Sequence, residues 1–256
     1  LSDGDLDYAK FRENHRFQIP DGCHWSDIRA IASDIGKMLQ NALHKIEKAN
    51  FELLHDVFGD AQWTNKRRLS DEKLIDLIEH FSQYDLCNSN VDSDLLGNSY
   101  EYLIKHFADL TNKKAGEFYT PRSVVHLLGL ILDPHEGETV YDPACGTGGM
   151  LLECVVHLKG IKEDYRTLKL FGQEKNLTSS SIARMNMFLH GVFNADIRKG
   201  DTLGDPQHTR GGELMSFDRV IANPPFSLKK WGKDTADNDP YGRFPYGTPP
   251  KDAGDL

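Results

Sequence analysis

Four polar side chains of this 256-residue chain each follow a short apolar run of the kind that forms a buried strand. They are Asp142, Glu174, Asp201 and Asn223. In a parallel sheet ligands bind outside the carboxyl ends of the strands, so polar residues at four such ends predict one site. The types of these side chains indicate what the site binds.

Asp142 opens a glycine-rich turn, Asp-Pro-Ala-Cys-Gly-Thr-Gly-Gly at 142–149, and a helical pattern follows it. The glycines of this turn allow backbone N–H groups to come close to a ligand. A dinucleotide-binding turn would instead have Gly-x-Gly-x-x-Gly spacing, and Asp142 would repel its phosphates. A carboxylate at this place suits a cationic ligand, such as the ammonium group of an amino acid.

Glu174 and Asp201 indicate a nucleoside. Glu174 follows the second strand, where a carboxylate can accept hydrogen bonds from two ribose hydroxyls. Asp201 follows the third strand and can accept from the exocyclic amine of an adenine ring. A nucleoside that carries an amino-acid tail satisfies these two residues and Asp142 together. We therefore predict S-adenosylmethionine as the cofactor.

The fourth strand end carries Asn223-Pro224-Pro225-Phe226, which suits a planar amine on a heteroaromatic ring. The Asn223 side-chain oxygen and the Pro224 carbonyl can accept its two hydrogens and direct the nitrogen lone pair at a methyl group. Phe226 offers a face on which a base can stack, an interaction of about 1–3 kcal/mol in single-strand binders. The base must leave the duplex to reach such a site. Taken alone, a double proline after asparagine would only end a strand.

The elements that position these residues alternate along residues 139–222. Strands are expected at 139–142, 168–172, 195–197 and 217–222, and a helix at 177–189. This order predicts an α/β fold, a Rossmann-like doubly wound methyltransferase sheet with helices on both faces. Four strands are fewer than usual, so C-terminal strands are expected to be missing from this sequence, and no regular element is expected in its last thirty residues. The inward face of the helix is predicted to be Ile182, Met185, Phe188 and Leu189.

The preceding residues show helical periodicity and no alternating strand pattern. One helix is expected from an N-cap at Ser26, and others after Ser70 and Ser93. Thr120 followed by Pro121 predicts a further helix start, with Thr120 as N-cap. We predict an all-α N-terminal domain at 1–110 and the catalytic domain at 111–256. The apolar stripe of the first helix is Ile28, Ile31, Ile35, Met38, Leu39, Leu43 and Ile46.

Charge is unevenly distributed between these domains. The net charge is −9, and residues 1–110 hold 12 Lys and Arg against 20 Asp and Glu. Such an acidic region is a poor surface for nucleic-acid phosphates, so a partner is expected to supply much of the affinity for DNA. Four cysteines without a pairing pattern indicate reduced thiols and a cytoplasmic protein. No apolar run of about 18 residues predicts a membrane span, and no metal site is expected.

The glycine turn and the Asn-Pro-Pro-Phe motif resemble those of amino-group DNA methyltransferases of the gamma motif order. Gly-Glu-Phe-Tyr-Thr-Pro-Arg at 116–122 narrows the resemblance to the modification subunits of type I restriction-modification systems. This resemblance implies methylation of the N6 amine of adenine in DNA, in the cytoplasm of a bacterium or archaeon. It also implies as partners a specificity subunit, a restriction subunit and DNA, with two modification subunits for each specificity subunit.

The resemblance also assigns roles to individual residues. Cofactor binding is expected at Glu117, Phe118, Tyr119, Thr120, Pro121, Arg122, Asp142, Gly146, Thr147, Gly148, Gly149, Glu174 and Asp201. Catalysis is expected at Asn223, Pro224, Pro225 and Phe226.

Other functions stay open to different degrees. The same acceptors could hold the N4 amine of cytosine, and the chain could be a non-catalytic scaffold that only binds the cofactor. Methylation of a protein glutamine uses a similar motif, commonly with tyrosine in place of Phe226. Methylation of cytosine C5 is disfavoured, because it needs a cysteine nucleophile where Asn223 stands, whereas Cys145 lies in the glycine turn.

Overall fold

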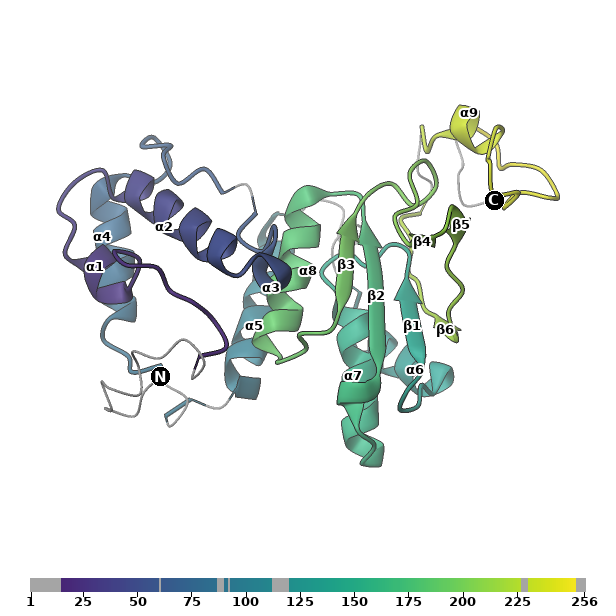
Figure 1. Ribbon diagram of the computed structural model, residues 1–256, viewed down its shortest axis with the longest axis horizontal. Helices are drawn as coiled ribbons and strands as arrows, with labels where there is room; N and C mark the ends of the chain where they lie inside the picture. Colours follow the sequence, from purple (N-terminus) through teal and green to yellow (C-terminus); the bar gives the residue numbers. More distant parts are fainter. Residues whose placement is uncertain are drawn as a thin grey trace. The chain divides into compact units, whose positions relative to one another are not determined.

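The computed structural model describes residues 15–59, 61–86, 90–91, 93–111, 120–226 and 230–251. The chain forms two compact units, residues 1–98 and 99–256. The division falls within helix α5 (Ser93–Thr111; Figure 1), so the helix predicted to follow Ser93 is present and includes Ser93 itself. The domain boundary predicted at 110/111 stays a prediction. None of the helices in the described residues combines the length and apolar character needed to cross a membrane.

The described helices of the first unit surround a small apolar core that includes Ile35 and Leu74, both fully buried. The helix predicted after Ser70 is confirmed, because the Ser70 hydroxyl accepts a hydrogen bond from the backbone N–H of Lys73 and caps it. The elements are α1 (Trp25–Arg29), α2 (Ile35–Ala49), α3 (Phe51–Leu54) and α4 (Asp71–Phe81).

The single helix predicted from Ser26 is wrong, because the structure has two helices there. The N-cap of helix α1 is His24, two residues before the predicted Ser26, and the helical conformation is interrupted before α2. Helix α1 ends at Arg29, and Asp34 precedes α2 as its N-cap in a left-handed conformation with φ 53°. Its backbone N–H donates to Asp71 and its carboxylate pairs with Lys66 at 2.6 Å. These long-range contacts fix a turn that the local apolar pattern does not reveal.

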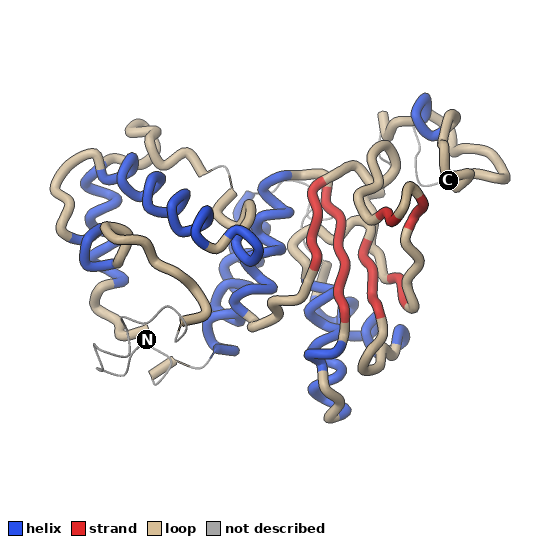
Figure 2. Tube along the Cα trace, viewed as in Figure 1, coloured by secondary structure: helices blue, strands red, loops and turns tan. Residues whose placement is uncertain are grey.

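The second unit is built on a parallel sheet with the strand order β3-β2-β1-β6, which runs from left to right in Figure 1 and is red in Figure 2. The chain therefore winds outward from β1 to β3 and then returns to place β6 on the other side of β1. This order confirms the predicted α/β sheet and puts the topological switch point between β1 and β6. The strands are β1 (Thr139–Asp142), β2 (Lys169–Glu174), β3 (Asp196–Lys199) and β6 (Arg219–Val220).

Three helices pack with this sheet: α6 (Arg122–Leu132), α7 (Gly149–Ile161) and α8 (Leu177–Leu189). Right-handed connections between strands that follow one another across a sheet place α7 and α8 on the same face. Their shared core includes Val140, Leu151, Leu158, Leu170 and Met187. The rings of Tyr141, Phe171, His208 and Phe217 pack together on the opposite side of the strands.

Helix α8 has the predicted bounds, but its buried face differs from the predicted one. Ala183, Asn186 and Met187 are buried, whereas the four predicted inward residues are only partly buried. The reason is close approach to the glycine turn: a Cβ on Gly148 would lie 2.8 Å from the Met187 Cε and 3.4 Å from the Ala183 Cβ. Ala183, Asn186 and Met187 therefore face this turn.

Several short elements were not predicted, among them helix α3, a 3-10 helix (Tyr165–Thr167), a hairpin and one helical turn. A two-stranded hairpin, β4 (Thr209–Arg210) and β5 (Glu213–Leu214), turns at Gly211 and Gly212, which both have positive φ. A Gly-Gly pair between extended residues is a known hairpin signal, so the sequence did contain this information. Near the carboxyl terminus α9 (Lys233–Ala236) forms one helical turn, and the prediction of no regular element there is wrong.

Candidate cofactor and target-base site

The glycine turn, which follows β1 in the chain, is hydrogen-bonded to the end of β2. The backbone N–H of Gly146 donates to Glu174 Oε2 at 3.0 Å, and that of Cys145 donates to the Gln173 carbonyl at 3.0 Å. Gly146 and Gly148 have φ angles of 54° and 81°, a conformation that glycine adopts at no steric cost. The structure therefore brings the predicted turn and the predicted ribose acceptor together.

The turn is packed on one side and open on the other. Gly148 lies against α8, and the buried Asn186 amide donates to the Thr147 carbonyl at 3.1 Å. A Cβ on Gly146 or on Gly149 would meet nothing within 4 Å. Space for a ligand close to the backbone is therefore present at these two glycines.

Asp142 is a buried carboxyl with an unfilled hydrogen-bonding capacity. Its side chain is fully buried, and Oδ1 accepts from the backbone N–H of Ala144 at 3.0 Å. Oδ2 is buried and has no partner among the described residues. Burial, with a contribution from the charge of Glu174, raises the pKa of Asp142 to about 7. Because a buried acceptor without a partner is costly, a cationic group of a ligand would be stabilised here.

Both carboxylate oxygens of Glu174 hold backbone N–H groups. Oε2 accepts from Gly146, and Oε1 accepts from Asn176 at 2.7 Å. Asn176 in turn caps α8 by accepting from Ser179. Each carboxylate oxygen can accept a second hydrogen bond, so Glu174 can position the turn and still receive ribose hydroxyls.

Asp201 is engaged by a residue that the sequence reasoning missed. Its Oδ2 pairs with the Lys175 Nζ at 2.6 Å, and Oδ1 accepts from the backbone N–H of Leu203 at 3.1 Å. Burial of the Asp201 carboxyl acts to raise its pKa, but the hydrogen bonds from Lys175 and the backbone outweigh burial and the net pKa is lowered. An adenine amine at Asp201 would therefore compete with Lys175, whose side chain is largely exposed.

The loop after Asp201 is tied to the sheet and to the glycine turn. The fully buried side chain of Gln173 donates to the Asp205 carbonyl and accepts from the Gln207 N–H, both at 3.0 Å. The Thr202 hydroxyl donates to the Pro143 carbonyl at 2.5 Å. The predicted strand ended at residue 172, whereas β2 includes Gln173, and neither Gln173 nor Thr202 was singled out from the sequence. Together these contacts hold the loop after Asp201 to the end of β2 and to the glycine turn.

Arg243 fastens the segment that follows Asn-Pro-Pro-Phe to the same loop. Its guanidinium donates to the Thr202 and Leu203 carbonyls at 2.8 and 2.7 Å and pairs with Asp239 at 2.7 Å. No local sequence pattern indicated this anchor.

The target-base motif follows β6, which pairs with β1 (Tyr141 opposite Val220). The Asn223 Nδ2 donates to the Thr120 hydroxyl at 2.9 Å, and the Phe226 ring is 72% exposed. Pro224 and Pro225 continue the chain between them. Asn223 and the glycine turn thus follow neighbouring strands at the switch point.

The motif at 116–122 is described only in part, since Glu117, Phe118 and Tyr119 lie outside the described residues. Helix α6 begins at Arg122 with Pro121 as N-cap, one residue later than predicted, and no side chain caps it. The Thr120 hydroxyl bonds Asn223 instead of the helix, which explains the difference. The Arg122 guanidinium pairs with Glu101 of α5.

Cys145 is buried within the glycine turn. Burial raises the pKa of its thiol, and the nearby carboxyls of Asp142 and Glu174 act in the same direction. The thiol therefore stays protonated, which makes it a poor nucleophile.

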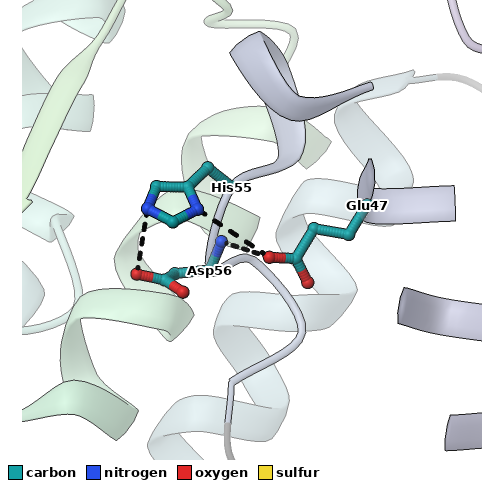
Figure 3. Close-up of side chains that lie close together, drawn as sticks. All are labelled: Glu47, His55 and Asp56. Atoms are coloured by element: carbon teal, nitrogen blue, oxygen red, sulfur yellow. Dashed lines mark hydrogen bonds and ion pairs between the residues drawn. The ribbon is translucent and has the colours of Figure 1, made fainter. Parts of the chain in front are cut away.

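A histidine lies between two carboxylates in the first unit (Figure 3). His55 Nε2 is 3.4 Å from Asp56 Oδ2, and Nδ1 is 3.9 Å from Glu47 Oε1. The backbone N–H of Asp56 also donates to Glu47 Oε1 at 2.8 Å. The three side chains lie within the reach of a single ion. They also satisfy one another at a partly exposed surface, and we assign no ligand to them.

The sheet order and the glycine turn at the switch point define the fold of S-adenosylmethionine-dependent methyltransferases. The family matches of the chain agree with a methyltransferase. The N-6 DNA methylase family matches residues 91–256, and the HsdM N-terminal domain matches residues 3–81. The chain belongs to the N-6 DNA methylase family.

Curated relatives are methylase subunits of type I restriction enzymes. The HindI subunit of Haemophilus influenzae is 32% identical over 86% of this chain and 49% of its own length. The MjaVII subunit of Methanocaldococcus jannaschii is 34% identical over 85% of this chain and 38% of its own length. The chain therefore spans half or less of the length of these relatives.

A solved structure extends the likeness to the whole chain. The type I restriction-modification methyltransferase subunit of Streptococcus thermophilus superposes with a TM-score of 0.78 at 28% identity. The match covers 97% of this chain and 56% of that subunit.

Proposed function

We propose that this chain is the cofactor-binding and target-base part of a type I modification subunit, which methylates the N6 amine of adenine in DNA. The observation that carries the proposal is the pairing of β1 with β6. This pairing places the end of β1, with the glycine turn, next to the strand that leads to Asn223. The proposed cofactor-binding turn and Asn223, which can hold an amine, therefore lie at the same topological switch point.

The cofactor fit rests on features of this chain. Asp142 has a buried oxygen without a described partner, which suits the ammonium of the methionine tail. Gly146 and Gly149 leave space beside the backbone, and Glu174 and Asp201 provide acceptors for the ribose and the adenine amine. When bound, S-adenosylmethionine supplies an electrophilic methyl group, and the electron pair of the broken carbon–sulfur bond stays on sulfur.

The target amine is held by acceptors and not by a base. Its lone pair is delocalised into the ring, so the nitrogen must become more tetrahedral before it can attack. The Asn223 side-chain oxygen and the Pro224 carbonyl accept its two hydrogens and favour this geometry. Neither carbonyl is basic, so the proton released after transfer passes to water. The exposed Phe226 ring provides the stacking surface for a base that has left the duplex.

The partners follow from the relatives and the charge. The matched relatives are subunits of type I restriction enzymes, which supports assembly with a specificity subunit, a restriction subunit and DNA in the cytoplasm. By the family resemblance the specificity subunit reads the base sequence. The acidic residues 1–110 are ill suited to phosphate, so a partner supplies much of the affinity for DNA. We also propose two modification subunits for each specificity subunit. The domain division at 110/111 and the cofactor roles of Glu117, Phe118, Tyr119, Pro121 and Arg122 complete the proposal.

The test is methyl transfer by the full-length subunit assembled with its specificity subunit. Duplex DNA is incubated with labelled S-adenosylmethionine, digested to nucleosides and separated by mass spectrometry. The proposal predicts label in N6-methyladenine. Label in N4-methylcytosine would reassign the substrate, and no label despite tight cofactor binding would support a scaffold instead.

A further inference from the structure

Thr120 and Asn223 are 103 residues apart in the chain and are joined by one hydrogen bond, from Asn223 Nδ2 to Thr120 Oγ1 at 2.9 Å. Thr120 lies just before α6, and Asn223 lies just after β6. Both residues are partly buried. The bond therefore links the end of the 116–122 motif directly to the target-base motif.

In this bond the Asn223 amide presents Nδ2 to Thr120 and leaves Oδ1 as the end available to a ligand. An amide is planar, with its donor nitrogen and its acceptor oxygen on opposite sides. Because Nδ2 is bonded to Thr120, Oδ1 points away from Thr120, and no described residue donates to it. If the amide rotated about its terminal torsion, which is soft, the NH2 group would face the target amine and oppose its hydrogens.

Thr120 is well placed to hold the amide. The Pro121 ring fixes its own φ, at −54°, and restricts the backbone of the residue before it. Helix α6 is anchored by the buried Val125 and by Gly129, where an added Cβ would lie 2.8 Å from the Glu153 Cγ. The Thr120 hydroxyl does not cap α6, so its oxygen is available as the acceptor for Asn223.

We infer that Thr120 is a positioning residue for methyl transfer: it holds the Asn223 amide so that Oδ1 faces the target amine. The inference rests on the proposed function and deepens it. It assigns to Thr120 a role toward the target base, whereas the family resemblance implies a contact with the cofactor. If Thr120 positions Asn223, loss of its hydroxyl should lower the rate of methyl transfer. If Thr120 contacts the cofactor, the loss should weaken cofactor binding.

The test compares Thr120→Val, which removes the acceptor and keeps the shape, with Thr120→Ser, which keeps the hydroxyl. Both are made in the full-length subunit assembled with its specificity subunit. The Val variant should lower the single-turnover rate of methyl transfer about 10- to 100-fold, the scale of one lost orienting contact. Its Kd values for S-adenosylmethionine and DNA should stay within about twofold, and the Ser variant should keep a rate within about threefold of the wild type.

Three results would overturn the inference. They are a Val variant that transfers at the wild-type rate, a Val variant whose cofactor affinity falls as far as its rate, and a Ser variant as slow as the Val variant. If the Val variant does not fold, Thr120→Ala takes its place under the same criteria. Failure of the proposed function would show separately, as absence of transfer by the wild type, and the inference would then fall with it.

Discussion

The backbone N–H of Gly146 donates to Glu174 Oε2 at 3.0 Å, which joins the glycine turn after β1 to the carboxylate that ends β2. One side chain therefore serves two purposes. It fixes the turn that approaches the cofactor, and it offers acceptors to the ribose. A change at Glu174 should disturb both the turn and the ligand.

Glu174→Ala should weaken binding of S-adenosylmethionine by at least about 1–3 kcal/mol, the cost of losing a partly buried acceptor and leaving N–H groups without a partner. The melting temperature of the ligand-free protein should also fall, because Gly146 and Asn176 lose their acceptor. Calorimetry and thermal melting measure the two effects. Glu213→Ala, in the exposed part of the hairpin, is the matched control, and unchanged affinity in Glu174→Ala would refute the ribose assignment.

Asp142 should make cofactor binding depend on pH. Burial raises its pKa to about 7, so the ligand-free protein holds the proton below that pH. The proton must leave before the carboxylate can pair with an ammonium group, and affinity should fall about tenfold for each pH unit below 7 and level off above it. Titrations between pH 5.5 and 8.5 measure this slope. In Asp142→Asn the affinity should be low at every pH, and a wild-type slope in that variant would contradict the assignment.

The same raised pKa should affect stability in the opposite sense. The folded protein binds the Asp142 proton more tightly than the unfolded chain, so this group favours the folded state at low pH. Its contribution is lost as pH rises through about 7. Without ligand, Asp142→Asn should therefore melt higher than the wild type at pH 8, and the difference should shrink at pH 5.5. An equal difference at both pH values would show that Asp142 is charged throughout.

Gly148 should be required for packing as well as for its backbone conformation. Gly148 and Gly137 have nearly the same φ, 81° and 82°, but only at Gly148 would a Cβ meet other atoms. Gly137→Ala should cost about 1 kcal/mol from backbone strain alone. Gly148→Ala should cost more, because Met187 must move, and it should also weaken cofactor binding. Equal losses in chemical denaturation would show that packing against α8 contributes nothing.

The sequence predicted best where a pattern is local. The bounds of β1 and α8 agree with the apolar periodicity, and the meeting of Asp142, Glu174 and the glycine turn follows from parallel strands alone. The helix break at Asp34 and the Lys175–Asp201 pair depend on residues brought together by folding. The bond between Thr120 and Asn223 joins residues 103 positions apart and has no local pattern. The buried face of α8 was missed because it includes serines, Ala183 and Asn186, which a search for large apolar residues at helical spacing does not count.

A substitution of Asn223 provides the most direct test of the proposed methyl transfer to adenine. The Asn223→Ala variant of the full-length subunit, assembled with its specificity subunit, is compared with the wild type for cofactor affinity and for single-turnover methyl transfer to adenine. Cofactor affinity should stay within about twofold, and methyl transfer should fall about 100-fold or more, the scale of removing one preorganised polar group from an active site. Transfer to adenine at the wild-type rate by Asn223→Ala would contradict this expectation.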